Sequence, residues 1–137
     1  MMVPNLLSLG AFLLVVQAMT AWDPVPAAVP ISDIDGNAIS TLSIGQQAIL
    51  EFNMHYEQDN ETQPFVALME VRGSDGVTQF LAWQMGTLSI GEGNLDVGFS
   101  WRAERAGDYQ VRSFLVTSLT NPEVLSDVRS SNFSVIE

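Results

Sequence analysis

The chain has 137 residues, 47% of them hydrophobic, which is enough apolar material for one domain with its own core. Its formal net charge is −11, with sixteen acidic residues against five arginines and no lysine. This balance excludes nucleic acid and argues against docking on an anionic membrane surface, because nothing would neutralise the phosphates. The absence of cysteine excludes thiol catalysis, thiolate metal sites and disulfides.

The N-terminus predicts that the chain is exported. Residues 6–21 are almost wholly apolar, a run shorter than a transmembrane helix needs and typical of a secretory signal, with cleavage after Ala18. No Lys or Arg precedes this run, so an uncleaved membrane anchor that ends near Trp22 is one alternative. A buried strand or helix of the domain is a second alternative. We expect residues 1–22 to be a signal peptide or an anchor and assembly segment, and the protein to be extracellular or at the cell surface, secreted or anchored.

The rest of the chain divides into a spacer and one domain. Residues 23–30 contain three prolines and are predicted to be an extended spacer. Residues 31–137 have apolar residues at every second position between turn signals, which predicts an all-β, immunoglobulin-like antiparallel β-sandwich of seven or eight strands. The predicted strands are residues 31–34, 47–56, 65–72, 77–85, 95–101, 109–119 and 124–135.

The strand patterns also predict which side chains lie inside. Residues 65–72 are apolar on both faces, which favours a central strand. Alternation over residues 47–56 and 95–101 predicts one buried face for each of these strands, while Gly91-Glu92-Gly93-Asn94 is predicted to be a turn. Trp83 is expected to be buried with Leu81 and Met85; a Trp83 exposed beside Phe80 would instead give an apolar patch that marks a protein contact.

A tyrosine corner is predicted where the chain crosses between the sheets. Gly107 lies in a tight corner after the strand that ends at Trp101, and Tyr109 opens the next strand. We expect the Tyr109 ring to lie in the core with its hydroxyl in a buried hydrogen bond to nearby backbone. These three residues are therefore interpreted as structural.

Four motifs resemble a known family: LSIGQQ (42–47), VRGSDG (71–76), GFSW (98–101) and AGDYQV (106–111). Together they are similar to extracellular, adhesion-related, CARDB-like immunoglobulin modules of archaeal and bacterial cell-surface proteins, over about residues 30–137. The stretch SLTNPEVLS (118–126) also resembles secreted proteins of ammonia-oxidising archaea. The resemblance implies a β-sandwich with adhesion, spacing or surface-assembly roles, and no catalytic residue that could be transferred.

Two patterns raise the question of a metal site. His55 is the one histidine of the chain, and copper there would need methionines from other strands, such as Met69 or Met85. The segment Asp33-Ile34-Asp35-Gly36-Asn37 is similar to a calcium loop, but its glycine comes too early and no bidentate acid follows. We expect an exposed histidine, a hairpin turn, and no metal or other cofactor.

The remaining polar motifs do not predict an enzyme. Glu57, Asp59 and Glu61 fall in one polar loop, which indicates a solvated rim rather than a pair of catalytic carboxylates. No nucleophile-elbow, phosphate-binding, dinucleotide-binding or metalloprotease motif occurs. Asn60 and Asn132 each begin an N-glycosylation sequon, with Asn60 in the more accessible setting.

The sequence therefore favours a non-enzymatic cell-surface domain that acts in protein–protein interaction, adhesion or surface assembly. Its expected partners are other protein subunits or surface-layer components, including further copies in a pilus-like filament, with membrane contact through residues 1–22 if they persist. The alternatives are a single-span accessory or stator-type subunit of a membrane complex, and a small-ligand or copper-binding module. Lateral strand pairing is the expected mechanism, with residues 29–34 and 131–136 as the candidate edges.

Overall fold

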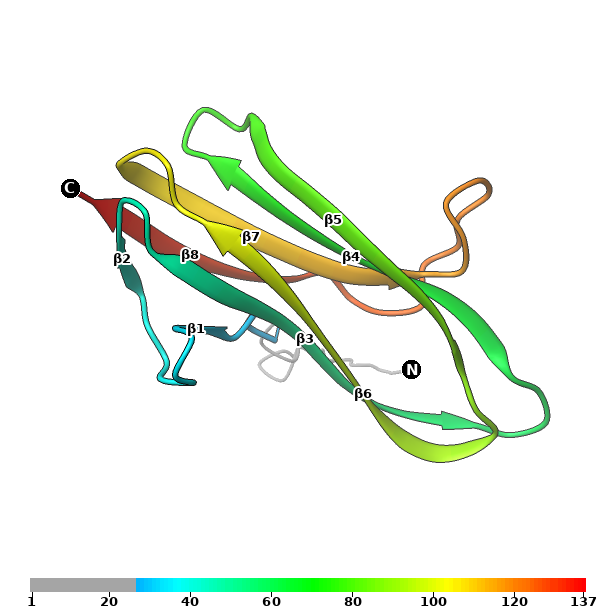
Figure 1. Ribbon diagram of the computed structural model, residues 1–137. Helices are drawn as coiled ribbons and strands as arrows, with labels where there is room; N and C mark the ends of the chain where they lie inside the picture. Colours follow the sequence, from blue (N-terminus) through cyan, green and yellow to red (C-terminus); the bar gives the residue numbers. More distant parts are fainter. Residues whose placement is uncertain (1–26) are drawn as a thin grey trace, which may run out of the picture.

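The computed structural model describes residues 27–137, which form an all-β sandwich of eight strands in two sheets (Figure 1). This confirms the predicted fold class and the upper predicted strand number, and residues 27–137 contain no helix. Residues 1–22 and the first part of the predicted spacer lie outside the described residues. The strands are β1 (Ile31–Ser32), β2 (Thr41–Ser43), β3 (Gln47–Gln58), β4 (Gln63–Gly73), β5 (Thr78–Leu88), β6 (Gly91–Arg102), β7 (Gly107–Val116) and β8 (Arg129–Ile136).

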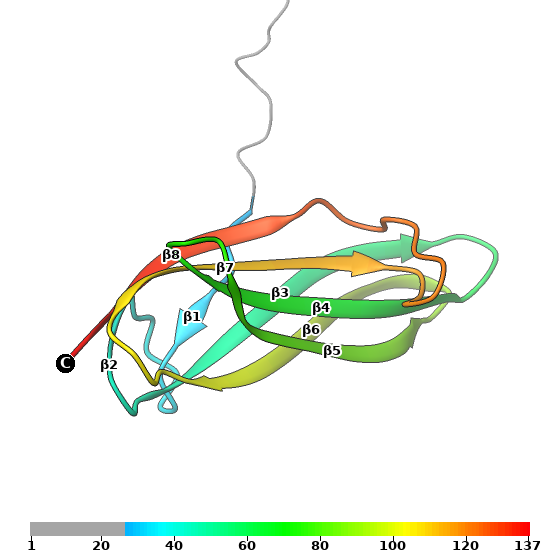
Figure 2. The same cartoon turned by 90° about the horizontal axis from the view of Figure 1, so that it is seen from above.

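The strands are divided unequally between the sheets. One sheet has three strands in the order β1-β3-β6, and the other has five in the order β2-β8-β7-β4-β5. The β3–β4, β5–β6 and β7–β8 loops gather at one end of the sandwich, while the β2–β3, β4–β5 and β6–β7 turns and the C-terminus gather at the other (Figures 1 and 2). Each long strand therefore runs from one end of the molecule to the other.

The core lies between the sheets and follows the predicted alternation. On β3, Leu50 and Phe52 are fully buried, and on β6 Val97 and Trp101 are buried, as predicted for the inward positions of both strands. β4 lies between β7 and β5, which confirms that it is a central strand. Alternation produces this arrangement because successive side chains of a strand point to opposite faces of its sheet.

The strand order corrects the predicted edges. β2 was not anticipated, and it pairs in parallel with β8, with Thr41 opposite Ser134 and Ser43 opposite Ile136. β8 is therefore an interior strand, and the prediction of residues 131–136 as an edge is wrong. A three-residue strand is too short to show a period in the sequence, so the alternation gave no sign of it. The edges of the two sheets are β1 and β6, and β2 and β5.

Residues 27–30 lie against the domain. Val29 is buried in the core, and Ser131 on β8 binds both its backbone groups: the Val29 amide donates to the hydroxyl at 2.9 Å, and the hydroxyl donates to the Val29 carbonyl at 2.8 Å. The Pro30 carbonyl accepts a hydrogen bond from the Glu51 amide. These contacts fasten the start of the described chain to both sheets.

The predicted turn at residues 91–94 is wrong, because these residues form the start of β6. Pairing between β3 and β6 continues without a break from Gln47 opposite Arg102 to Gln58 opposite Gly91. Gly93 lies opposite Tyr56, and a Cβ at Gly93 would meet the Tyr56 ring. Gly93 therefore leaves room for the Tyr56 ring, and Gly91 adopts a positive φ of 100°. The chain reverses at residues 89–90 instead.

Candidate protein-contact surface

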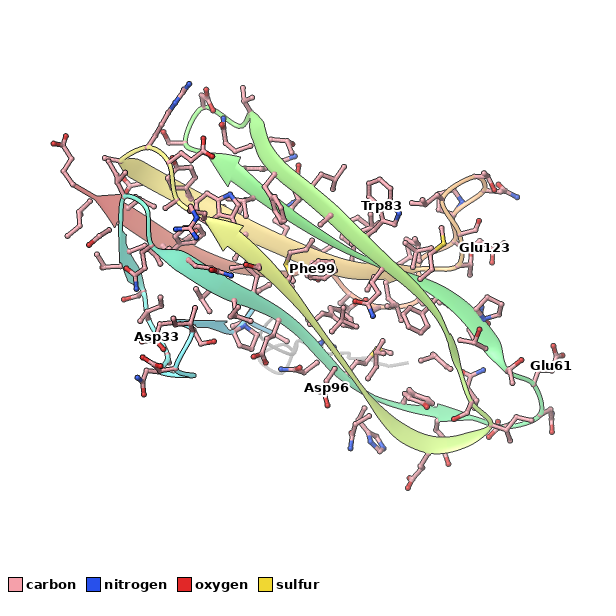
Figure 3. The ribbon with its side chains drawn as sticks, viewed as in Figure 1. Asp33, Glu61, Trp83, Asp96, Phe99 and Glu123 are labelled. Carbon is pink, nitrogen blue, oxygen red and sulfur yellow. The ribbon has the colours of Figure 1, made fainter. Side chains whose placement is uncertain are left out.

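The outward side chains of β5 are large and apolar. Leu81, Trp83 and Met85 are 53%, 51% and 61% exposed. The expectation that Trp83 is buried is therefore wrong, and Figure 3 shows its side chain directed away from the sandwich while Phe99 on β6 lies between the layers. On the inward side of β5, the buried Phe65 ring lies against Gly86, where a Cβ would come within 2.6 Å of it.

Pairing with neighbouring strands extends this patch across the sheet. Trp83 lies opposite Leu68 on β4, which lies opposite Phe114 on β7. In a second row, Met85 lies opposite Val66 on β4, Val66 opposite Val116 on β7, and Val116 opposite Val124. Val66 and Val116 are buried, but they do not belong to the core between the sheets. We call the two rows and Leu81 the outer apolar surface: Leu68, Leu81, Trp83, Met85, Phe114, Val66, Val116 and Val124.

A partly buried carboxylate borders the outer apolar surface. Glu70 on β4 is opposite Leu81 and Arg112, and its side chain is 13% exposed. The Arg112 Nε donates to Glu70 Oε1 at 3.1 Å, the Arg72 Nε lies 3.4 Å from Oε2, and the Thr78 hydroxyl donates to the same carboxylate. Burial alone would raise the pKa of Glu70, but these hydrogen bonds and the arginine charge outweigh it and lower the pKa.

Beyond this ion cluster the same face becomes polar. A shallow groove toward β2 is lined by outward side chains that include Arg72, Gln110, Asn132 and Ser134. Asn132 is exposed and lies opposite Gln110, and Asn60 is exposed in the β3–β4 loop. Both sequon asparagines are therefore on the surface, although Asn132 lies within a strand.

The outer face of the three-stranded sheet is hydrophilic, and His55 lies on it. The His55 Nδ1 is 3.2 Å from the Asn94 side-chain oxygen, and its Nε2 is 3.8 Å from the Glu92 carboxylate. The methionines considered as copper ligands lie elsewhere: Met69 is fully buried in the other sheet, and Met85 is on the outside of that sheet. The fold therefore does not bring these three side chains together.

The other acidic motifs are loop and turn structures. The Asp33 carboxylate accepts the Asp35 and Asn37 amides at 3.0 and 2.9 Å, and the Asn37 hydrogen bond is the largest cause that lowers the pKa of Asp33. The prediction that Glu57, Asp59 and Glu61 share one loop is wrong for Glu57, because β3 extends to Gln58; Asp59 and Glu61 lie in the β3–β4 loop, and all three side chains are exposed. Within residues 27–137, no group of three or more His, Asp or Glu side chains is placed to hold a metal ion.

The predicted corner residues meet at the opposite end of the sandwich. The Tyr109 hydroxyl donates to the Arg105 carbonyl at 2.8 Å, in a solvent-exposed position rather than the buried one expected. The Tyr109 ring stacks on Phe133 and meets Trp101 edge to face, each at 5.5 Å between centroids. Gly107, between Trp101 and Tyr109 in the chain, has a positive φ of 150°.

Several solved structures share this fold. The C-terminal domain of wzt superposes with a TM-score of 0.67 at 18% identity, covering 80% of this chain and 71% of that one. The CARDB domain of a Pyrococcus furiosus protein, described in complex with di-metal ions, superposes with a TM-score of 0.55 at 13% identity, covering 80% and 86%. The chain therefore has the CARDB-like β-sandwich fold that the motifs implied.

No protein-family model matches the chain, and no curated protein matches it in sequence. In the part of the chain that the structure describes, there is no helix long and apolar enough to cross a membrane. The structural comparisons establish the fold alone, so the function has to be inferred from the surface of the sandwich.

Proposed function

We propose that the chain is a non-enzymatic, exported cell-surface module that binds another protein subunit through the outer apolar surface. One observation carries this proposal: Leu81, Trp83 and Met85 are exposed side by side on one long edge strand. Exposed apolar patches of this kind mark protein contacts, and a tryptophan at the centre of such a patch is typical of an energetic anchor. The apolar residues 6–21 support export and a place at the cell surface.

The composition of the surface supports a protein partner over other classes. The outer apolar surface is lined by aliphatic and aromatic side chains, and the chain as a whole carries a net charge of −11. The Glu70 cluster at its border is already paired with two arginines and a threonine, so it is interpreted as a rigid polar rim. Its hydrogen bonds connect β4 to β5 and to β7 beside the contact face.

Site-specific photo-cross-linking in the native cells tests this proposal. A photoreactive amino acid replaces Trp83 in the full chain, and a matched variant carries it at His55 on the hydrophilic face of the other sheet. We expect a covalent adduct with a protein from position 83 and none from position 55. Equal, background-level adducts at both positions would contradict the proposed contact surface.

Fractionation of the same cells tests export. We expect the protein in the medium or at the surface, with an N-terminal sequence that begins after Ala18 if the segment is cleaved, or detergent-dependent extraction if it is an anchor. A cytoplasmic protein that retains Met1 would contradict export and leave the contact surface to be judged by the cross-links alone.

A further inference from the structure

The long free edge of β5 is the starting point. In the described part of the chain, β5 pairs with β4 on one side and with no strand on the other. It has 11 residues, and it separates from β6 after the turn that joins them (Figure 1). Such an edge presents backbone N–H and C=O groups that can pair with another strand.

β5 also lacks the features that normally protect an edge. Residues 78–88 contain no charged residue and no proline, and the single register shift against β4, between Val71 and Arg72, lies near one end. The other edges are protected: β1 and β2 have two and three residues, and β6 carries Glu92 and Asp96. β5 is therefore the one edge of the described sandwich that is both long and uncharged.

The charge of the chain indicates what can approach this edge. With a net charge of −11, two copies repel one another over most of their surfaces. An uncharged strand that pairs with itself places no like charges opposite each other, and the nearest charged cluster combines Glu70 with Arg72 and Arg112. A second copy of the same strand therefore meets less repulsion at β5 than elsewhere.

The sequence of β5 is also complementary to itself in antiparallel orientation. A register centred on Trp83 places Leu81 opposite Met85 of the second copy and Phe80 opposite Gly86, a large side chain against a glycine. The two tryptophans meet at the two-fold axis. Aromatic and aliphatic pairs opposite one another are the contacts that stabilise antiparallel strands.

We propose that β5 pairs with β5 of a second copy, antiparallel and across a two-fold axis at Trp83, to join the two five-stranded sheets into one. This inference rests on the proposed function and names its partner. The interface is isologous, so it closes on itself and produces a dimer. Leu81, Trp83 and Met85 of both copies then form one continuous apolar strip on the outside of the joined sheet.

Sedimentation of the purified full chain in mild detergent tests the dimer. We compare the natural chain with Trp83→Lys and with a matched control, Asn53→Lys, on the exposed outer face of β3. We expect a concentration-dependent dimer, weakened about tenfold or more by Trp83→Lys and unchanged by Asn53→Lys. A monomer at every concentration, or equal effects of the two lysines, would overturn the proposal.

Disulfide trapping tests the register, and the absence of natural cysteine makes it unambiguous. A mixture of Leu81→Cys and Met85→Cys chains should form a mixed disulfide, because these positions are opposite each other in the proposed pairing. Leu81→Cys mixed with Thr87→Cys is the control, displaced by about 7 Å along the strand and too far to bridge. Equal yields in the two mixtures would overturn the antiparallel register.

The two proposals can fail separately. If the purified chain is monomeric but position 83 cross-links a different protein in cells, the β5–β5 dimer is wrong and the contact surface stands. If position 83 forms no adduct and the chain is monomeric, both are wrong.

Discussion

β5 and β6 are edge strands of similar length, joined by one short turn, yet they present different surfaces. β6 follows a simple pattern, with Val97 and Trp101 buried and the acidic Glu92 and Asp96 outside. β5 is uncharged and carries Trp83 outside. Figure 3 shows the contrast, since Trp83 and Asp96 both point away from the sandwich, on opposite layers. Charge therefore protects the edge of the three-stranded sheet at β6, while the edge of the five-stranded sheet at β5 has no such protection.

The largest expected difference between β5 and β6 is in the stability lost when their tryptophans are replaced. Trp101→Ala removes a buried ring that touches Tyr109 and Phe133, and we expect a loss of about 3–5 kcal/mol in the free energy of unfolding. Trp83→Ala in the monomer should change it by about 0.5 kcal/mol or less, because the ring is half exposed. Urea denaturation measures both. Similar losses would mean that Trp83 belongs to the core.

Replacing one glycine on each of these strands by alanine is also expected to change stability unequally. In Gly86→Ala on β5, the new methyl group would collide with the buried Phe65 ring, so we expect a loss of about 1–3 kcal/mol. Gly98→Ala on β6 meets ordinary contact with Ile49 at 3.8 Å, and we expect no loss. Thermal melting of the two variants would reveal the difference, and a Gly86→Ala chain as stable as the parent would show that the Phe65 ring lies elsewhere.

The stability contributed by the Glu70 carboxylate, on β4 next to β5, is expected to depend on pH. The pKa of Glu70 is lowered from its ordinary value of 4.5. Its contribution to the free energy of unfolding is therefore complete above about pH 4.5, and it is lost as the pH falls through the lower pKa of the folded state. Glu70→Gln should cost about 1–2 kcal/mol at pH 7 and progressively less below about pH 4.5. Denaturation of this variant and of Asp96→Asn across pH 3–7 measures it; a cost independent of pH would contradict the ion cluster.

The smallest expected effect concerns the corner that follows β6. Tyr109→Phe removes the hydroxyl that donates to Arg105 but keeps the ring against Trp101 and Phe133. We expect a loss of about 0.5–1.5 kcal/mol, because the hydrogen bond is exposed and water replaces part of it. Equilibrium unfolding measures the change, and an unchanged stability would show that the bond is not formed in solution.

Much of the architecture was predictable from local patterns. Alternation identified the inward positions of β3 and β6 because polar residues occupy the opposite positions. The turn at Asp33 was likewise predictable, since Asp and Gly at these positions favour an Asx turn, which the two amides bonded to Asp33 complete. Each of these features depends on residues within one strand or one turn.

The candidate site was only partly predictable. The sequence placed Trp83, Leu81 and Met85 on one face, and it associated a Trp83 exposed beside Phe80 with a protein contact. Trp83 is exposed, but Phe80 packs against the core on the other face. The sequence could not decide between the faces, because Phe80 and Leu88 make the other face of β5 apolar as well. The signal that could have decided it is Gly86, which leaves room for Phe65 on the inward side.

By itself, the sequence determined an all-β sandwich, its long strands and the residues that share each face, because a period of two is a local property of the chain. Which strands are edges and which apolar face is covered depend on how the sheets assemble. The parallel pairing of β2 with β8 joins residues more than ninety positions apart, and it turned the last strand into an interior one. Partner choice and burial depend on how the two sheets meet, and no single strand carries that information.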